Sequence, residues 1–260
     1  MQHHNLAAEA WYLHGEVGGG EGLPLATRVR RSYGEVAVMA KTKTKATLVI
    51  SSKNYSSWSL RGWLMAKWAG LEFEEQIASS DDPAIRAELL LQSSSILVPT
   101  LIHDGHSVWD TVAIGEYLHE HFPAAGLLPD DRQARARCRS ICGEMHSGFS
   151  ALRSALPVNL RSTKPGFAVW SAAQADIDRI LKIWHECFVR YKGPYLFGKK
   201  VTIADAMYAP VCTRFRTYCV KLDPEADAYC ERIMTLPTMA EWIEAAKLEP
   251  EEMPELDAEF

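Results

Sequence analysis

The stretch Ser51–Gly70, SSKNYSSWSLRGWLMAKWAG, joins a predicted strand to a predicted helix. The strand is the short β-rich run 47–50, TLVI, and the helix is indicated by Leu60 and Leu64, which recur at helical spacing. The polar loop between them leads into a helix N-terminus, whose free N–H groups and dipole stabilise an anion. An ordinary cap made by Ser or Asn explains the same residues without any ligand.

The composition is that of an ordinary globular protein with room for two domains. The chain has 260 residues, of which 47% are hydrophobic and 23% are charged, and its formal net charge is -5. This charge gives no reason to expect a nucleic acid or an anionic membrane as a partner. We find neither an apolar run of about 18 residues nor a basic region followed by an apolar one, so we expect a cytoplasmic protein.

Six cysteines all lie in the second half of the chain, and no two of them form a CxxC pair. We therefore expect reduced thiols and not a redox pair or a zinc ribbon. Cys138 and Cys142 lie one helical turn apart, but no second pair of ligands follows at zinc-finger spacing. The sequence predicts no metal site.

The sequence pattern changes twice along the chain. The first 44 residues are expected to be a flexible N-terminal extension, because they include the run GGGEG at 18–22 and show no sustained periodicity. The remaining parts are a first domain over residues 45–123, a linker over 124–132 that carries Gly, Pro and Asp, and a second domain over 133–260.

The first domain begins with a βαβ unit. Apolar residues alternate over 71–77, which indicates a strand after the first helix. Asp82-Pro83 then starts a helix, with Asp as the cap and Pro at the first helical position, and this helix stops at the serines 93–95.

A hairpin and a covering helix complete the first domain. The apolar runs 96–102 and 107–109 flank Asp104-Gly105, a dipeptide that suits a type I′ turn. A helix follows Asp110-Thr111 and ends before Pro123. The order β-α-β-α-β-β-α predicts a thioredoxin-like domain, because the first unit needs a parallel strand pair.

The sequence predicts an all-α bundle for the second domain. The predicted fold class is therefore α+β for the first domain and all-α for the second. Every long segment after the linker has helical periodicity. The predicted helices are Gln133–Leu156, Trp170–Tyr191, Thr202–Tyr218, Ala226–Met234 and Thr238–Ala246. In the third of them, Thr202 and Asp205 have the spacing of a capping box, which is a folding device.

Two further elements of the first domain suit a peptide ligand. The sequence LVPTL at 97–101 resembles the VPxL element that carries a cis-proline in thioredoxin-like proteins. A cis Val98-Pro99 bond would turn the backbone of Val98 outward, so that an extended peptide can pair with it. At Asp110-Thr111, a carboxylate can bind an amine, while the hydroxyl and the free helix N–H groups can bind a carboxylate.

The chain resembles the glutathione transferase superfamily through SSKNYSSWSLR, LVPTL, WDTVAIGEYL and GPYLFGKKVTIADA, over about residues 46–248. The resemblance is to cytosolic, bacterial-type members, with some features of the zeta class. It implies a homodimer and glutathione as co-substrate, with the cysteine backbone of glutathione along Val98 and Pro99 and its sulfur near the first helix. It also places the γ-glutamyl end at Asp110 and Thr111, where the superfamily usually has Glu or Gln followed by Ser.

Such an enzyme must hold glutathione as a thiolate near neutral pH. Lowering a thiol pKa of about 8.5 by two units needs about 2.7 kcal/mol, which one hydrogen bond to the anion and a helix N-terminus can supply. In related classes the catalytic Ser or Cys lies seven positions before a helix arginine, and counting back from Arg61 reaches Asn54. The candidates are Ser56 and Asn54 equally, then Tyr55 and Ser57, although Ser57 can instead be the helix cap. The loop has no Cys, unlike the omega and beta types.

The second domain is expected to supply the pocket for the acceptor substrate. The resemblance places the first helix of the bundle beside that pocket, which makes four residues candidates for its lining: His146, Phe149, Asn159 and Arg161. A lone helical His is more often packed or solvated than functional, so its geometry must decide.

Three functions agree with these features. The first is a detoxifying transferase that binds glutathione as a thiolate and conjugates it to a small hydrophobic electrophile. The second is an isomerase of the maleylacetoacetate type, which the SSWSLR run resembles and which returns glutathione unchanged. The third is a non-catalytic glutathione-binding or scaffold protein of the same fold, which Asn54 in the catalytic position supports.

Overall fold

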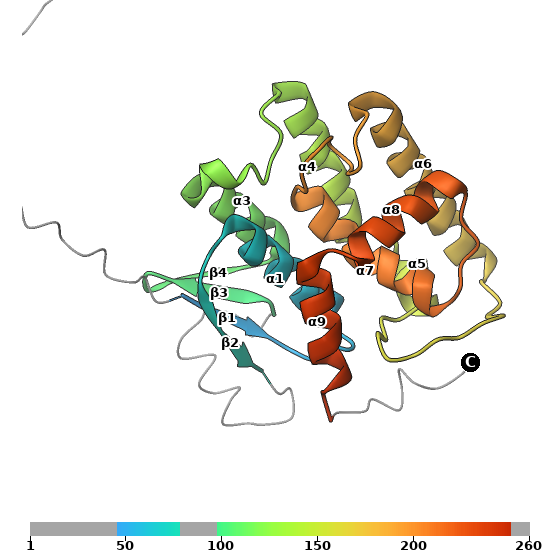
Figure 1. Ribbon diagram of the computed structural model, residues 1–260, viewed down its shortest axis with the longest axis horizontal. Helices are drawn as coiled ribbons and strands as arrows, with labels where there is room; N and C mark the ends of the chain where they lie inside the picture. Colours follow the sequence, from blue (N-terminus) through green and yellow to red (C-terminus); the bar gives the residue numbers. More distant parts are fainter. Residues whose placement is uncertain (1–45, 79–97, 251–260) are drawn as a thin grey trace, which may run out of the picture. The chain divides into compact units, whose positions relative to one another are not determined.

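The computed structural model describes residues 46–78 and 98–250, all of which belong to one compact unit, Thr42–Phe260. The predicted extension over residues 1–44 and the predicted helix that starts at Asp82-Pro83 lie outside the described residues. Figure 1 shows a sheet on one side and a set of helices on the other.

The sheet has four strands in the order β2-β1-β3-β4. Their bounds are Ala46–Ile50 for β1, Phe73–Ile77 for β2, Thr100–His103 for β3 and His106–Trp109 for β4. The central strand β1 pairs parallel with β2 and antiparallel with β3, and β3 pairs antiparallel with β4. This mixed sheet confirms the predicted thioredoxin-like domain.

Local signals in the first domain fold as expected. Asp104 and Gly105 both have positive φ, 53° and 76°, as the type I′ turn of the β3–β4 hairpin requires. Asp110 caps α3 (Thr111–His121), and a short 3₁₀ helix, η1 (Pro123–Ala125), follows it.

From residue 132 to residue 250, the described chain forms helices and no strand of the sheet. Its helices are α4 (Arg132–Ser147), α5 (Ser150–Ala155), α6 (Ser171–Tyr191), α7 (Ile203–Thr217), α8 (Pro224–Met234) and α9 (Pro237–Lys247). The capping box that starts α7 is present, because the Asp205 carboxylate accepts hydrogen bonds from the backbone N–H and the hydroxyl of Thr202, at 2.8 and 3.0 Å.

The single helix predicted over 133–156 is wrong, since the chain breaks between α4 and α5. The N–H of Gly148 donates to the carbonyl of Glu144, and a Cβ at Gly148 would lie 2.7 Å from that oxygen. Phe149 then adopts a left-handed conformation with φ of 59°. The apolar periodicity continues through this turn, which is why the sequence pattern did not reveal it.

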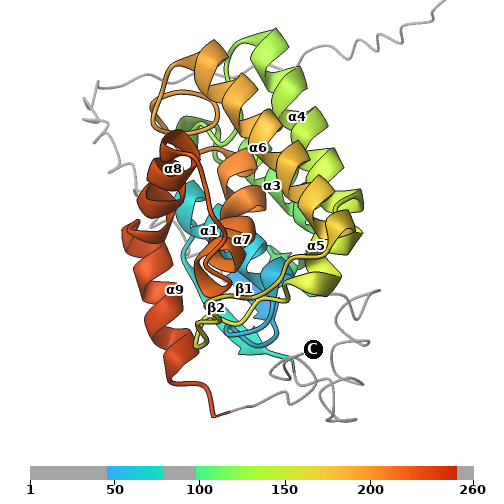
Figure 2. The ribbon, with the colours of Figure 1, turned by 90° about the vertical axis from the view of Figure 1, so that its right-hand side faces the viewer.

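Helix α1 (Ser57–Ala69) lies between the sheet and α7, at the centre of the molecule (Figure 1). Gly70 ends it with φ of 75°. Figure 2 shows α9 alongside α1, where the fully buried Trp63 and Trp242 rings lie 5.2 Å apart. Helix α1 therefore lies where the sheet and the helical part of the fold meet.

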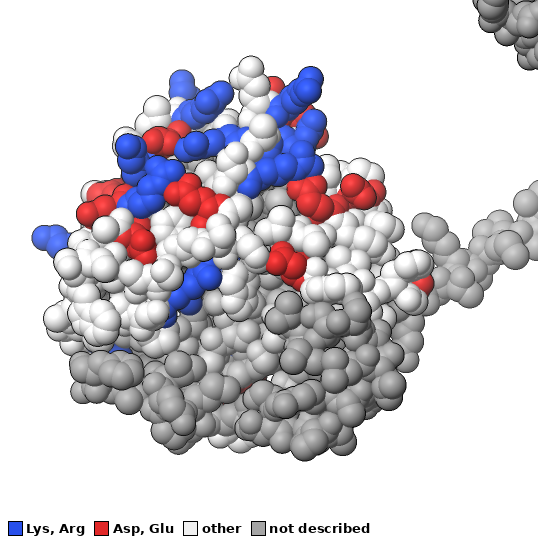
Figure 3. All heavy atoms as spheres, turned by 180° about the vertical axis from the view of Figure 1, so that it is seen from behind, with Lys and Arg blue, Asp and Glu red and all other residues white. Residues whose placement is uncertain are grey.

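Charged side chains of both signs lie beside one another on the face shown in Figure 3. Several ion pairs of the structure join helices, among them Arg137 with Glu186 at 2.5 Å and Arg179 with Glu144 at 2.6 Å, both between α4 and α6. Within residues 46–78 and 98–250, no helix is long and apolar enough to cross a membrane, and no three His, Cys, Asp or Glu side chains form a group suited to a metal ion.

Candidate functional site

Ser56 caps α1. Its hydroxyl oxygen accepts a hydrogen bond from the Ser59 N–H at 3.2 Å, and its proton is directed to the Ser59 hydroxyl at 2.9 Å. Ser57 is not the cap: it is buried, and its hydroxyl accepts from the Arg61 guanidinium at 3.5 Å. The hydroxyls of both serines are thus engaged within α1 itself.

Asn54 connects the loop before α1 to the segment after α5. Its side chain is fully buried, and its Oδ1 accepts hydrogen bonds from the backbone N–H groups of Leu160 and Arg161, at 2.8 and 3.0 Å. Its Nδ2 is buried and has no hydrogen-bond partner among the described residues. The amide is therefore fixed in position, and its two N–H bonds donate to no described group.

The loop does bind an anion, but the anion is a side chain of the same protein. The carboxylate of Glu249 accepts from the backbone N–H of Lys53 at 2.5 Å, from the N–H of Asn54 at 3.0 Å and from the hydroxyl of Ser52 at 2.7 Å. Glu249 follows α9, so the end of the helical part holds the loop that precedes α1. Nothing in the sequence pattern indicates this contact, because about two hundred residues separate the partners.

Arg161 reinforces the same loop. Its guanidinium donates to the hydroxyl of Tyr55 at 3.3 Å and to the backbone carbonyl of Glu249 at 2.8 Å. Asn159 is buried and orients the segment, since its Oδ1 accepts from the Arg161 N–H at 3.1 Å and its carbonyl accepts from the Thr217 hydroxyl. These two predicted pocket residues thus lie at the loop together with the candidates Asn54 and Tyr55.

The cis bond predicted at Val98-Pro99 is present. The peptide bond is cis, Pro99 is buried, and Val98 is half-buried. Helix α1 approaches this turn at Gly62, where a Cβ would lie 2.6 Å from the Cγ of Pro99. The close approach places the first half of α1 directly beside the start of β3.

Asp110 faces both halves of the fold. Its Oδ1 accepts from the Val112 N–H at 2.8 Å, which caps α3, and its Oδ2 lies 2.9 Å from the Nε2 of His146 on α4. The next residue, Thr111, is buried, and its hydroxyl has no hydrogen-bond partner in the described part of the chain. The predicted γ-glutamyl site therefore includes His146 as an added neighbour.

Trp58 links His146 to the first turn of α1. The His146 and Trp58 rings meet edge to face, with centroids 5.1 Å apart. Trp58 was not among the predicted site residues, although it directly follows them in the sequence. Phe149 is separate from this group: it is buried at 7% exposure and belongs to the hydrophobic core.

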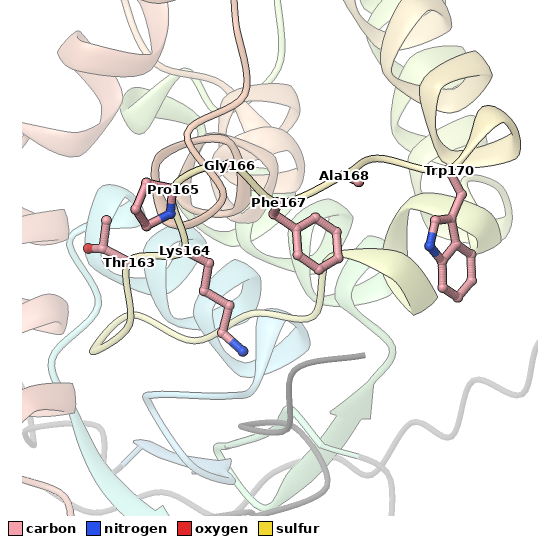
Figure 4. A pocket seen from close by; sticks show the side chains of 7 residues that line it. All are labelled: Thr163, Lys164, Pro165, Gly166, Phe167, Ala168 and Trp170. Carbon is pink, nitrogen blue, oxygen red and sulfur yellow. The ribbon is translucent and has the colours of Figure 1, made fainter.

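A surface cavity of about 480 Å³ lies on the loop between α5 and α6, shown in Figure 4. Its lining residues are Thr163, Lys164, Pro165, Gly166, Phe167, Ala168 and Trp170. Phe167 packs against Tyr218 with ring centroids 4.8 Å apart, whereas Trp170 is 57% exposed. The loop continues from the segment that holds Asn54.

Both halves of the chain match models of one family. The model for the glutathione S-transferase N-terminal domain matches residues 55–121, and that for the glutathione S-transferase C-terminal domain matches residues 132–245. The chain therefore belongs to the glutathione S-transferase superfamily. This agrees with the thioredoxin-like sheet and the helical bundle described above.

Proteins with sequences similar to this chain are named either maleylacetoacetate isomerase or glutathione S-transferase. A probable maleylacetoacetate isomerase of Caenorhabditis elegans is 28% identical over 65% of this chain and 78% of its own length. Glutathione S-transferase 1 of Dianthus caryophyllus is 29% identical over 66% of this chain and 78% of its own length. The maleylacetoacetate isomerase of Rattus norvegicus is 32% identical, but the match spans only 49% of this chain and 57% of the rat protein.

A solved structure shares the fold. It is a glutathione transferase homolog from Burkholderia gl BGR1 with bound glutathione, 25% identical, with a TM-score of 0.59, and the likeness covers 78% of this chain and 98% of that one. Membership of the superfamily and this neighbour support glutathione binding.

Proposed function

We propose that this protein is a glutathione S-transferase that binds glutathione as a thiolate and conjugates it to a small electrophile. The observation that carries the proposal is the position of two buried polar groups without partners among the described residues, Asn54 Nδ2 and Thr111 Oγ1. Buried polar groups are normally hydrogen-bonded, so such groups point to a missing ligand. They lie where the resemblance expects the sulfur and the γ-glutamyl end of glutathione.

The binding mode follows from the elements around these groups. The backbone of the glutathione cysteine pairs with Val98, as an added strand would. The γ-glutamyl ammonium binds the carboxylate of Asp110, and the γ-glutamyl carboxylate binds the Thr111 hydroxyl and the N-terminus of α3. His146, which now lies 2.9 Å from Asp110, shares that carboxylate with the incoming amine.

The thiolate is stabilised by Asn54 and the N-terminus of α1. A hydrogen bond to a charged group contributes about 1.5–3 kcal/mol, and about 1.36 kcal/mol lowers a pKa by one unit. The Asn54 amide alone therefore accounts for a decrease of one to two units in the thiol pKa. Asn54 suits this role better than Ser56, whose proton already goes to the Ser59 hydroxyl.

Calorimetric titration with glutathione tests the binding mode. Asp110→Asn keeps the helix cap, because Asn caps as well as Asp, but removes the charge that binds the γ-glutamyl amine. We expect it to weaken binding about tenfold or more, as the loss of a charged hydrogen bond would. The matched control is Asp131→Asn at the cap of α4, where Asp131 accepts from the Ala134 N–H at 2.7 Å. Equal affinities of both variants and the wild type would contradict the mode.

An isomerase of the maleylacetoacetate type is a second candidate. The descriptions of the worm and rat relatives favour it, at 28% and 32% identity. Mass spectrometry of the products separates the two activities, because a transferase leaves a glutathione adduct and an isomerase returns free glutathione. Binding of glutathione with no turnover of electrophiles or of maleylacetoacetate would instead support the non-catalytic role.

The homodimer implied by the superfamily is part of the proposal. Light scattering of the purified protein tests it, since a dimer has twice the mass of the chain, 29.1 kDa. A monomer at concentrations that give full activity would contradict it.

A further inference from the structure

The last helix of the described chain, α9, contacts the loop before α1 at the residue next to Asn54. The indole N–H of Trp242 donates a hydrogen bond to the backbone carbonyl of Lys53 at 2.9 Å. Trp242 is fully buried, and the carbonyl that it holds belongs to the peptide bond that joins Lys53 to Asn54. The contact therefore joins the helical part of the fold to the backbone that carries the proposed thiolate donor.

Lys53 is also fixed at its backbone N–H and at its side chain. Its N–H donates to the carboxylate of Glu249 at 2.5 Å. Its ammonium group lies 5.3 Å from the centre of the Trp242 ring, which attracts a cation, and forms an ion pair with Glu75 on β2 at 2.5 Å. Both the backbone and the side chain of Lys53 are thus held, and Trp242 contacts each of them.

The Trp242 side chain is itself held by the packing of α9 on α1. Its ring lies 5.2 Å from the ring of Trp63, and both rings belong to the hydrophobic core with no exposed surface. Protein interiors are close-packed, so a fully buried indole keeps one orientation. The Trp242 N–H is therefore a rigid donor, and its position is set by two helices and not by the loop.

The direction of the Asn54 amide depends on the peptide bond that precedes it. Asn54 Oδ1 accepts from the N–H groups of Leu160 and Arg161, so the segment after α5 holds the far end of the side chain. The near end is held through the planar peptide unit whose oxygen accepts from Trp242. A rotation of that unit moves the Cα–Cβ bond of Asn54, and Nδ2 moves with it.

We propose that Trp242 is a positioning residue for the reaction: through the carbonyl of Lys53 it keeps the Asn54 amide in the direction that donates to the sulfur of glutathione. The inference rests on the proposed transferase function and adds to it a residue of the helical part, which acts through Asn54. Without the indole N–H, the Lys53 carbonyl loses its donor, and the loop samples other orientations. The thiolate then loses part of its stabilisation.

Trp242→Phe tests the inference, because it keeps an aromatic ring in the core but removes the N–H donor. The matched control is Trp68→Phe. The Trp68 indole N–H donates to the hydroxyl of Thr238 at 3.0 Å, so this variant also removes an indole hydrogen bond between α1 and α9, but at the first turn of α9. A second variant carries at position 242 a tryptophan analogue in which sulfur replaces the N–H, which preserves the size of the ring and separates the loss of the donor from the loss of packing.

Two measurements over pH read out the position of Asn54. The thiol of bound glutathione is titrated by its ultraviolet thiolate absorbance, and kcat/KM is measured with chlorodinitrobenzene, from which the thiolate displaces chloride. We expect both variants at position 242 to raise the thiol pKa by about half a unit or more, which is the roughly threefold effect of one neutral hydrogen bond. Below the wild-type pKa, kcat/KM should therefore fall about threefold, and above both pKa values it should equal that of the wild type. A loss of folded protein alone would lower the rate equally at every pH.

The outcomes distinguish the inference from the proposed function. If the sulfur analogue at position 242 titrates like the wild type, the inference is overturned and the proposed function stands. An equal rise of the thiol pKa in Trp68→Phe would also overturn the inference, because the general packing of α9 would then be the cause. A wild type that leaves the thiol pKa at the value of free glutathione would refute the proposed function, and the inference with it.

Discussion

Removal of the Glu249 carboxylate should loosen the loop that presents Asn54. The carboxylate accepts hydrogen bonds from two backbone N–H groups and from the Ser52 hydroxyl, at 2.5–3.0 Å. A hydrogen bond to a charged group contributes about 1.5–3 kcal/mol, and water recovers part of it at a partly exposed residue such as Glu249. We therefore expect Glu249→Ala to lower the free energy of unfolding by about 2–3 kcal/mol.

Thermal unfolding and glutathione titration measure the effect. A loss of this size corresponds to a decrease of roughly 5–10 °C in Tm for a unit of this length. Glu249→Gln should lose about half as much, because its remaining carbonyl oxygen still accepts from the loop. The control is Glu244→Ala on α9, the helix that precedes Glu249, where Glu244 is exposed and, among the described residues, pairs with Lys247 at 2.7 Å. We expect that variant to stay within about 0.5 kcal/mol of the wild type.

The variant should also change the chemistry, because Asn54 belongs to the loop that Glu249 holds. We expect the pKa of the thiol of bound glutathione to be higher in Glu249→Ala than in the wild type. If Glu249→Ala unfolds like the Glu244→Ala control and leaves that pKa unchanged, then Glu249 does not position the loop.

Three further predictions concern other contacts. Gly62→Ala would place a Cβ 2.6 Å from Pro99 Cγ. Because this clash costs more than the gain in helix propensity, the free energy of unfolding, measured by chemical denaturation, should fall by an amount on the order of 1 kcal/mol. Unchanged stability would show that Pro99 can move away. Thr111→Val removes a buried hydroxyl that has no hydrogen-bond partner among the described residues, so we expect little change in the free energy of unfolding. The affinity for glutathione, measured by calorimetry, should fall about tenfold. A loss of stability with normal affinity would refute this role. The hydrogen bond from Arg139 lowers the pKa of Glu116 in the folded protein. The pair therefore stabilises the fold at any pH above the pKa of an unfolded Glu, about 4.3. This contribution is lost as the pH falls through the lower pKa of the folded state. Glu116→Gln should cost no more than about 1 kcal/mol at neutral pH, and unfolding curves of the two proteins should converge in acid; a difference that persists there would contradict the assignment.

The elements of the fold that the sequence predicted correctly depend on local patterns. The Asp104-Gly105 turn, the Asp110 cap and the Thr202–Asp205 capping box are each set by neighbouring residues. The break at Phe149 was missed because it does not interrupt the apolar period of the helices on either side.

The contacts of the candidate site were harder to predict because they join distant segments. The His146–Asp110 pair, the Glu249 carboxylate at the loop and the Trp242 N–H at Lys53 all depend on how α4 and α9 pack against the first domain. The sequence predicts a ligand site at the loop of Asn54, whereas the direction of each side chain in that loop follows only from the tertiary structure.

Titration of the thiol of bound glutathione tests the central claim most directly. The ultraviolet absorbance of the thiolate is followed against pH in the wild type, in Asn54→Ala and in Ser56→Ala, each saturated with glutathione. We expect the wild type to lower the thiol pKa by one to two units from about 8.5, and Asn54→Ala to restore about one unit or more of this shift, whereas Ser56→Ala should have a smaller effect. A wild-type pKa equal to that of free glutathione, or an Asn54→Ala variant that titrates like the wild type, would contradict the account.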